Sequence, residues 1–324
     1  MAEYEPIEVR GIYRSSSHMP VWAVMQEAGL WDRVGIKLTS FVYIDGSAEA
    51  ERLLLSGEID FISGNHISTY TDFTKGRPIV HLTSPSNAVR DKLISREPMS
   101  HVSDLRGKRL GETSQIGADG GYSHTRGNHM LYVLKSGLQL SDVVWVDLAE
   151  KLSDEALESR IVSALQDGTI DAAMVTGGTT AYEQAGFHVL PMGELPMING
   201  PTLTSTTPLL QRKDRLAERL VKAQLMGLQY AHIRPAECER ILKRLSEGSS
   251  RTYRMDSLTK LARKPYPAIE AVANAWELAC MTTPSTRDTT PLTLWDLHYL
   301  RTLDDAGFVE EFCKSAAEPQ AVGA

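Results

Sequence analysis

Two segments of the chain share one pattern, Leu53-Leu54-Leu55-Ser56-Gly57-Glu58-Ile59-Asp60 and Ala164-Leu165-Gln166-Asp167-Gly168-Thr169-Ile170-Asp171. In each, a helix-like run reaches a glycine, and the Ile-Asp pair beyond it leads into a strand-like run. The first strand-like run ends at Ser63-Gly64-Asn65 and the second at Thr176-Gly177-Gly178. Another helix-like run follows each of these small polar turns. A unit repeated in this way predicts two similar lobes, each with its own sheet.

Outward from these segments, β-rich runs alternate with amphipathic helical runs over the first two thirds of the chain. Strands are predicted at Ile7–Tyr13, Ile36–Ile44, Ile59–Ser63, Ile79–Thr83, Lys108–Glu112, Val143–Leu148, Ile170–Thr176 and Phe187–Met192. Helices are predicted at His18–Leu30, Ala48–Leu55, Ile67–Lys75, Tyr122–Leu134, Ser159–Leu165, Thr179–Ala185, Leu209–Ile233, Ala236–Leu245, Ala268–Met281 and Leu292–Phe312. This order indicates an α/β fold of mostly parallel sheets flanked by helices, with a helical C-terminal region.

The composition limits the classes of function. With 42% hydrophobic and 23% charged residues the chain resembles an ordinary globular protein, and its formal charge of −7 argues against a nucleic-acid partner. No window holds the roughly 18 apolar residues that a membrane span needs. Cys238, Cys280 and Cys313 show neither a disulfide framework nor metal-binding spacing. The glycine-rich run 117–121 lacks the Gly-Lys-Ser/Thr ending of a phosphate-binding loop. Neither a metal nor a cofactor is predicted.

The start of the sequence predicts a cytoplasmic location. It reads Met1-Ala2-Glu3-Tyr4-Glu5-Pro6, which is acidic and broken by proline. An export signal would have a basic start and an uninterrupted apolar run. A chain from which such a segment has been trimmed is the alternative.

A series of landmarks over residues 7–240 resembles the type II periplasmic-binding-protein-like superfamily. These landmarks are His18-Met19-Pro20, Glu27-Ala28-Gly29-Leu30-Trp31, Val34-Gly35-Ile36-Lys37-Leu38, Ser56-Gly57-Glu58-Ile59-Asp60, Ser103-Asp104-Leu105-Arg106-Gly107-Lys108-Arg109-Leu110-Gly111 and Gly168-Thr169-Ile170-Asp171-Ala172-Ala173. The nearest branch holds the sulfonate-, taurine- and nitrate-binding proteins and the thiamine-pyrimidine synthases. The cysteine-rich motif of those synthases and the export signal usual among the transport members are both absent, which indicates a cytosolic variant.

The resemblance implies a discontinuous first lobe, residues 1–86 plus 205–324 with the C-terminal helices, and a second lobe, residues 87–204. The chain would cross between the lobes near Ser84–Leu93 and Pro201–Thr207, and a ligand would lie in the cleft between them. The superfamily also includes cytosolic enzymes, among them aromatic carboxylate decarboxylases and an aryl sulfinate desulfinase. The fold alone therefore leaves both a binder and an enzyme open.

Polar residues follow the predicted strands, where ligands meet open α/β sheets. The predicted ligand-binding residues are Tyr13, Arg14, Ser17, Tyr43, Gly46, Ser47, Asn65, Thr113, Ser114, Gly117, Gly120, Gly121, Arg126, Thr176 and Gly177. Helix starts at Gly46-Ser47, in the segment 113–122 and at 177–180 would suit a carboxylate or sulfonate through their free N–H groups. Ordinary N-capping by the same residue types is the alternative.

Arginines and tyrosines at these positions sharpen the prediction of an anionic, aromatic ligand. Arg14 and Arg126 could each clamp a carboxylate through two parallel hydrogen bonds, or could be solvated surface residues. Tyr13 and Tyr43, at strand ends, could hold an aromatic ring between them.

Histidines at three of these loops are the candidate catalytic residues: His66 first, then His18 and His124. Histidine can transfer a proton near neutral pH, for example to the carbon that loses carbon dioxide in a decarboxylation. A residue that only contacts the ligand or caps a helix is the alternative for His66. The three lack the spacing of a metal site.

Two functions remain at this point. The favoured one is a cytosolic enzyme, a decarboxylase-like lyase or desulfinase-like C–S hydrolase, acting without redox chemistry on a small carboxylate or sulfinate anion. The alternative is the substrate-binding protein of an ABC transporter, with the permease as partner, or a ligand sensor, with no catalysis. The C-terminal helices offer surface for a second copy, so a homo-oligomer is also among the expected partners.

Overall fold

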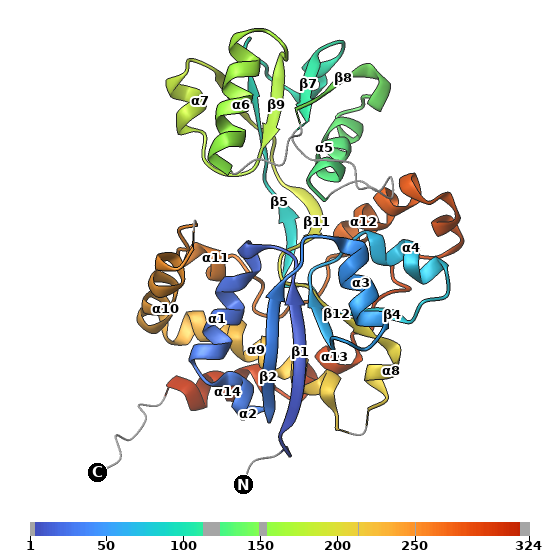
Figure 1. Cartoon of the computed structure of the whole chain (residues 1–324), viewed down its shortest axis with the longest axis vertical. Coiled ribbons are helices and arrows are strands. Elements are labelled where there is room, and N and C mark those ends of the chain that lie inside the picture. Colours follow the sequence, from blue (N-terminus) through green and yellow to red (C-terminus); the bar gives the residue numbers. More distant parts are fainter. Residues whose placement is uncertain (1–3, 113–123, 149–153, 213, 250, 318–324) are drawn as a thin grey trace. The chain divides into compact units, whose positions relative to one another are not determined.

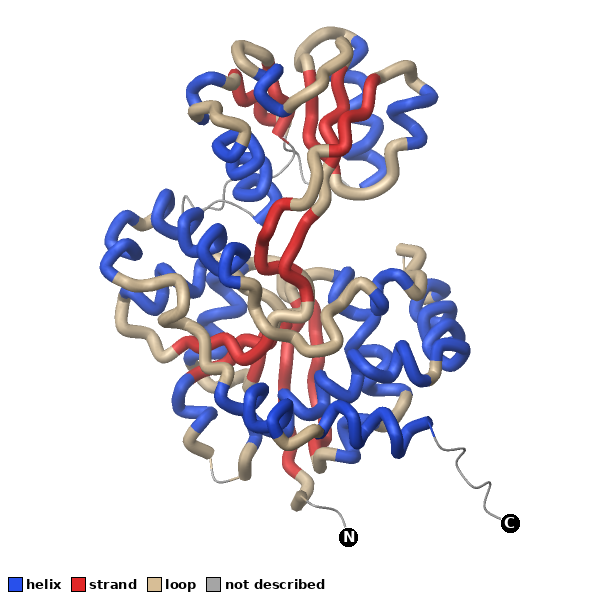
Figure 2. The backbone as a smooth tube through the Cα atoms, turned by 180° about the vertical axis from the view of Figure 1, so that it is seen from behind, coloured by secondary structure: helices blue, strands red, loops and turns tan. Residues whose placement is uncertain are grey.

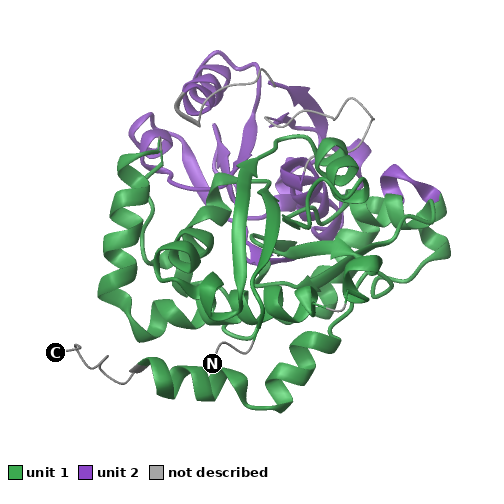
Figure 3. Ribbon diagram, turned by 60° about the horizontal axis from the view of Figure 1, so that its bottom comes forward, with its two compact units in different colours: residues 1–87, 198–279, 285–324 green, residues 88–197, 280–284 purple. Residues whose placement is uncertain are grey.

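The computed structural model describes residues 4–112, 124–148, 154–212, 214–249 and 251–317. It divides into two compact units, shown in separate colours in Figure 3. Unit 1 comprises Met1–Asn87, Ile198–Ala279 and Ser285–Ala324, and unit 2 comprises Ala88–Met197 and Cys280–Pro284. The short strands β5 (Ser86–Val89) and β11 (Leu195–Asn199) pair with each other where the chain passes from one unit to the next.

Unit 1 is built on a five-stranded sheet with the order β2-β1-β3-β12-β4. Its strands are β1 (Ile7–Tyr13), β2 (Ile36–Tyr43), β3 (Phe61–Ser63), β4 (Ile79–Thr83) and β12 (Leu203–Thr206). β1 pairs in parallel with β2 and β3, whereas β12 runs antiparallel to both β3 and β4. Only β12 therefore runs against the other strands. The carboxyl ends of β1, β2 and β3 lie at one edge.

Helices cover both faces of this sheet (Figures 1 and 2). Before residue 88 they are η1 (Ser16–His18), α1 (Met19–Glu27), α2 (Leu30–Arg33), α3 (Ser47–Leu55) and α4 (Ser68–Thr74). After residue 197 they are α8 (Thr207–Leu210), α9 (Leu216–Ile233), α10 (Pro235–Glu247), α11 (Asp256–Thr259), α12 (Ile269–Thr282), η4 (Pro284–Asp288), α13 (His298–Asp305) and α14 (Phe308–Ala317). α1 and α9 bury the larger core with Trp22, Phe61 and Leu220, and α3 covers Ile12 and Ile62 on the opposite face.

Unit 2 repeats this plan with a sheet of order β10-β6-β9-β7-β8. Its elements are β6 (Lys92–Ser95), η2 (Val102–Leu105), β7 (Arg109–Glu112), α5 (His124–Lys135), η3 (Leu140–Asp142), β8 (Val144–Asp147), α6 (Asp154–Gln166), β9 (Ala172–Val175), α7 (Thr180–Gln184) and β10 (His188–Pro191). β7 pairs in parallel with β8 and β9, and β6 runs antiparallel to both its neighbours. α6 packs Ile161 and Leu165 against Ile170 in the core of this unit.

The predicted α/β fold class is confirmed, and each predicted strand is present. The strands β5, β6, β11 and β12 were not predicted, because four or five residues of mixed polarity carry too little alternation to recognise. Two predicted long helices are each divided in the structure. Gly307, with φ 71°, separates α13 from α14, and Arg215, with φ 55°, precedes α9. The left-handed backbone of Gly307 follows the end of α13, and that of Arg215 is at the N-cap of α9.

Within the described ranges, no helix has both the length and the apolar character that crossing a bilayer requires.

Candidate functional site

Arg14 lies at the carboxyl edge of the unit 1 sheet, directly after β1, and its backbone N–H donates to Ser63 O at 3.1 Å. Its guanidinium is held by three bonds from different groups. Nε donates to Asn65 Oδ1 at 2.5 Å, Nη2 donates to Ser47 Oγ at 2.8 Å, and Nη1 donates to the carbonyl of Ile44. Arginine has five N–H donors, so within the described part of the chain two remain for a ligand. The cation is therefore both fixed in place and able to donate further.

The turn Gly64-Asn65 packs against the side chain of Arg14. Gly64 has φ 120°, and a Cβ there would come within 2.9 Å of both Cβ and Cγ of Arg14. Asn65 has φ 61°, a left-handed conformation that asparagine tolerates better than most residues. Its Nδ2 donates to Glu51 Oε1 at 2.9 Å while its Oδ1 accepts from Arg14. Glycine is thus required for close approach, and asparagine joins the arginine to Glu51 of α3.

Gly46 and Ser47 begin α3 beside the same guanidinium. Gly46 is the N-cap residue, and no side chain caps the helix there. The N–H groups of the first turn and the helix dipole together favour a negative charge at this end. Because Ser47 Oγ accepts from Arg14, the start of α3 and the guanidinium are held next to each other.

Aromatic rings adjoin the arginine. The ring centroid of Tyr13 lies 5.6 Å from that of Tyr43 and 5.2 Å from that of Phe41. Tyr13 and Tyr43 therefore contact each other and leave no space for a ligand ring between them. Tyr43 is 49% exposed, so an aromatic ligand would stack on its open side. Tyr43 also donates its hydroxyl to Asp45 Oδ1 at 2.9 Å.

The electrostatics at this edge centre on a partly buried cation. Burial lowers the pKa of the Arg14 guanidinium, whereas neighbouring acidic groups, Asp45 first, act in the opposite direction. Arginine nevertheless stays charged in proteins. Asp45 is solvent-exposed, so water screens its charge more than it screens that of Arg14. An anion beside Arg14 would replace lost solvation with charge-assisted hydrogen bonds.

The other predicted residues of unit 1 have different surroundings. His18 is 5% exposed, and its Nδ1 lies 3.0 Å from the carbonyl of Ser63. Trp22 Nε1 also donates to Ser63, through its Oγ. His18 is therefore a buried residue that packs against the end of β3. Ser17 lies in η1, where its N–H donates to Ser15 Oγ at 3.2 Å. His66 follows the Gly64-Asn65 turn and is partly exposed.

In unit 2, Thr113, Ser114, Gly117, Gly120 and Gly121 lie outside the described residues. His124 begins α5, and the Arg126 guanidinium lies 5.7 Å from the centre of the Trp145 ring. Thr176 Oγ1 donates to Asp91 Oδ1 at 2.6 Å, and the carbonyl of Gly177 accepts from Lys92 Nζ at 2.5 Å. The structure therefore brings six predicted residues together in unit 1: Tyr13, Arg14, Tyr43, Gly46, Ser47 and Asn65.

Two acids behind this group were not predicted. Glu51 of α3 and Asp72 of α4 are 4% and 5% exposed, although acidic residues on helices usually face water. One signal was present in the sequence. Glu51 is four residues after Ser47, and residues four apart lie on the same face of a helix.

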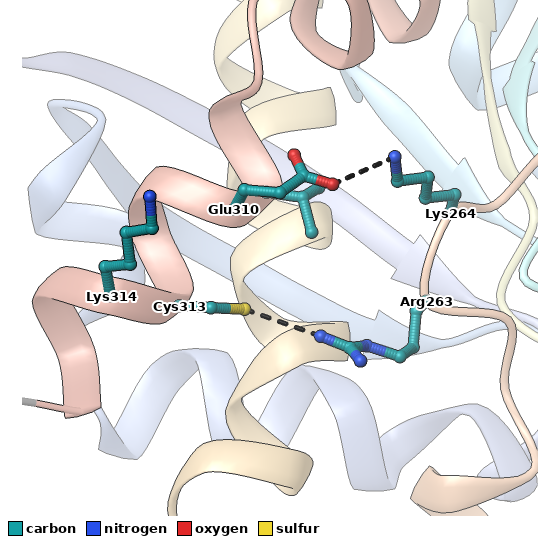
Figure 4. Close-up of a pocket in the computed structure, with 6 residues that line it drawn as sticks. Arg263, Lys264, Glu310, Cys313 and Lys314 are labelled. Carbon is teal, nitrogen blue, oxygen red and sulfur yellow. Dashed lines mark hydrogen bonds and ion pairs between the residues drawn. The ribbon is translucent and has the colours of Figure 1, made fainter.

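A pocket elsewhere in unit 1 involves none of the predicted residues. It is an open pocket of about 510 Å³ lined by Arg263, Lys264, Val309, Glu310, Cys313 and Lys314. Lys264 pairs with Glu310 at 3.1 Å, and Arg263 donates to Cys313 Sγ at 3.5 Å (Figure 4). Lys264 and Arg263 therefore already have partners within the pocket, and the candidate site remains at Arg14. Among the described residues, no group of three or more histidine, cysteine or acidic side chains could hold a metal ion.

A family model described as NMT1/THI5 like matches residues 15–238. No curated protein matches the sequence. A putative periplasmic sulfonate-binding protein SsuA of a Methylobacillus flagellatus ABC transporter is 14% identical, with a TM-score of 0.66 over 95% of this chain and 97% of that one. The periplasmic aliphatic sulphonate binding protein SsuA of Escherichia coli is 15% identical, with a TM-score of 0.59 over 91% and 92%. The alkanesulfonate-binding protein SsuA of Xanthomonas axonopodis pv. citri, bound to MOPS, is 16% identical, with a TM-score of 0.57 over 90% and 97%.

These matches confirm the type II periplasmic-binding-protein-like fold and correct two predictions. The prediction of a decarboxylase- or desulfinase-like enzyme is contradicted, because the three structural relatives named above are binding proteins, which favours the alternative reading. His18, His66 and His124 are therefore not retained as catalytic residues. The cytoplasmic location is also wrong, since matched proteins are periplasmic.

Proposed function

Since the chain belongs to the NMT1/THI5-like family, we propose that it is a binding protein for a small organic anion and performs no chemistry on it. The observation that carries this proposal is Arg14, which three protein acceptors hold beside exposed aromatic surface. Sulfonates are the first class to test, because the structural relatives are named for them. A sulfonate has the oxygen geometry to accept both remaining N–H groups.

The surroundings of Arg14 favour an anion that carries an apolar group. The start of α3 adds favourable partial charge for the anionic head. The exposed ring of Tyr43 would contact the rest of the ligand, and a flat aromatic group gains most from such stacking. We therefore propose an arenesulfonate or a related aromatic anion as the preferred ligand.

The relatives also supply the proposed setting. We propose an extracytoplasmic location and an ABC permease as partner, because a structural relative is named as a component of such a transporter. The contribution of unit 2 to the site, the division of the lobes at residues 86/87 and 204/205, and a homo-oligomer stay predictions from the sequence.

The proposal is tested by titration calorimetry of the full chain with benzenesulfonate, ethanesulfonate, benzoate and the neutral benzenesulfonamide. We expect binding of the anions and much weaker binding of the sulfonamide. Arg14→Gln should weaken benzenesulfonate binding by roughly 10- to 100-fold, the effect of losing hydrogen bonds to a charged group. Arg14→Lys should recover only part of this loss, because lysine lacks the planar fork of donors.

The matched control is Arg52→Gln, which removes a positive charge from exposed α3 surface where Arg52 pairs with Glu49 and Glu58. It should leave the affinity within about twofold, since exposed pairs contribute little. Mass spectrometry of the recovered ligand should find it unchanged. Equal affinity in wild type and Arg14→Gln would remove Arg14 from the site, and a converted ligand would restore the enzyme reading.

A further inference from the structure

Two buried carboxyl groups lie in contact behind the candidate site. Glu51 and Asp72 are 4% and 5% exposed, and their side chains share a hydrogen bond. Two carboxylates cannot both be ionised at such close range, so one proton lies between them. The contact between Glu51 and Asp72 thus depends on this shared proton.

The pair is connected to Arg14 by a chain of hydrogen bonds. Glu51 Oε1 accepts from Ser68 Oγ at 2.5 Å and from Asn65 Nδ2 at 2.9 Å. The Asn65 carbonyl oxygen then accepts from Arg14 Nε. An amide between an acid and a guanidinium has its orientation fixed by both partners, since only its nitrogen donates and only its oxygen accepts. Glu51 therefore sets which way Asn65 turns, and Asn65 positions Arg14.

The charged groups around the pair determine which acid holds the proton. Asp72 pairs with Arg77 at 3.1 Å and with Lys75 at 4.0 Å. Glu51 faces Asp72 from α4 and Arg14 from the end of β1, and within the described residues it forms no ion pair with a cation. Burial and the hydrogen bond with Asp72 raise the pKa of Glu51 to about 8. The proton thus belongs mainly to Glu51 at neutral pH.

On the premise that the site binds an anion, we propose that protonated Glu51 is a positioning residue that makes the affinity for the anion depend on pH. Removing its proton places a second negative charge behind Asn65 and turns the hydrogen bond to Asp72 into a repulsion between two carboxylates. The pair would then separate, and the orientation of Asn65 toward Arg14 would loosen. Both effects weaken the binding of an anion in alkaline solution.

The test is a titration of the full chain with benzenesulfonate at intervals from pH 6 to pH 9.5. The sulfonate stays ionised over this range, so any change in affinity comes from the protein. Wild-type affinity should fall by roughly five- to tenfold as the pH passes 8, the effect of one extra charge at a partly screened distance. Glu51→Gln, which keeps the acceptor for Asn65 and a donor for Asp72, should bind at pH 7 within about twofold of wild type and lose most of this fall.

The matched control is Glu49→Gln, which removes an exposed acid from the first turn of the same helix and should keep the wild-type pH profile. A second variant, Asp72→Asn, removes the like charge and should move the fall in affinity to lower pH. An unchanged profile in Glu51→Gln would overturn the inference while leaving the anion-binding function intact. A wild-type chain that binds no anion at pH 6 would instead overturn the function itself.

Urea unfolding gives a readout that does not depend on ligand. The pKa of Glu51 lies above its ordinary 4.5 in the folded state. The folded chain therefore binds more protons than the unfolded chain between about pH 4.5 and 8, and its stability falls as the pH rises through that window. Glu51→Gln should lack this fall, and an identical pH dependence in both proteins would contradict a shared proton.

Discussion

The repeated segments of the two units are the same at the start of the strand and different at its end. Asp60 precedes β3 and Asp171 precedes β9. In unit 1, Asp60 N donates to Arg10 O and Asp60 Oδ2 accepts from Arg10 N, both at 2.8 Å. In unit 2, Asp171 makes the same two bonds with Arg109, again at 2.8 Å. One aspartate thus ties the strand to its neighbour in each sheet.

At the other end of the strand the units diverge. Gly64 and Gly177 have nearly the same positive φ, 120° and 115°. A Cβ at Gly64 would strike the side chain of Arg14, whereas a Cβ at Gly177 would meet no described atom within 4 Å. Asn65 follows Gly64 and binds Arg14 and Glu51, but Gly178 follows Gly177 and has no side chain to offer. The aspartates hold both sheets together, whereas only the turn in unit 1 holds the arginine that we propose binds an anion.

The largest expected effect is at the two glycines. Gly64→Ala should lower the free energy of unfolding by about 2–4 kcal/mol, because it combines backbone strain with a collision against Arg14. Gly177→Ala should cost about 1–2 kcal/mol, from backbone strain alone. Urea unfolding followed by circular dichroism measures both. Equal losses would show that the space around the two turns does not distinguish them.

The aspartates should give smaller effects that match each other. Asp60→Ala and Asp171→Ala should each lower the free energy of unfolding by about 1–2 kcal/mol, since each leaves a strand N–H without its acceptor. A loss confined to one unit, seen by hydrogen exchange, would break the equivalence.

Acid titration sharpens the test in unit 2. The hydrogen bond from Arg109 lowers the pKa of Asp171 from 3.8 to about 2. Its stabilising contribution is therefore complete above about pH 4 and is lost as the pH falls through about 2. Asp171→Asn should lack this step in acid unfolding.

The smallest effect on stability is expected at the residue that distinguishes the turns. Asn65→Gly loses hydrogen bonds to Arg14 and Glu51 but relieves a left-handed backbone, and each change is worth about 1 kcal/mol in opposite directions. The free energy of unfolding should therefore change by less than about 1 kcal/mol, while benzenesulfonate affinity falls several-fold. Unfolding and calorimetry on the same preparation check both parts. Weakened folding with intact binding would make the turn a structural element.

The sequence predicted the fold through patterns that recur along the chain. Hydrophobic periodicity and the Gly-x-Ile-Asp repeat placed β3 and β9 and indicated two similar sheets, because buried strands and helix ends have local signatures. Arg14, Ser47 and Asn65 were also identified from sequence, since each follows a strand or begins a helix. These are positions that the chain order alone defines.

The rest depends on contacts between distant residues. Glu51 reads as a solvated helix acid until Asp72 and Asn65 are seen beside it. His18 reads as a loop histidine, yet Ser63 and the packing of α1 bury it. The preference for an enzyme rested on three histidines in loops, and the comparisons with binding proteins overturn it. The burial of His18 shows in addition that side-chain type indicates chemistry only when the surroundings are known.

The aspartate before β3 has a consequence for how this chain can diverge. Because Asp60 holds the strand at its beginning, substitution of Asn65 changes the group beside Arg14 at little cost to the sheet, whereas Gly64 is constrained by the side chain of Arg14. In unit 2, Asp171 makes the equivalent hydrogen bonds although the strand ends in Gly177-Gly178. The sheet therefore accepts either asparagine or glycine at the second position of the turn. Proteins that evolve from this chain can therefore change the residue after Gly64, and with it the surroundings of Arg14, while they keep the same sheet.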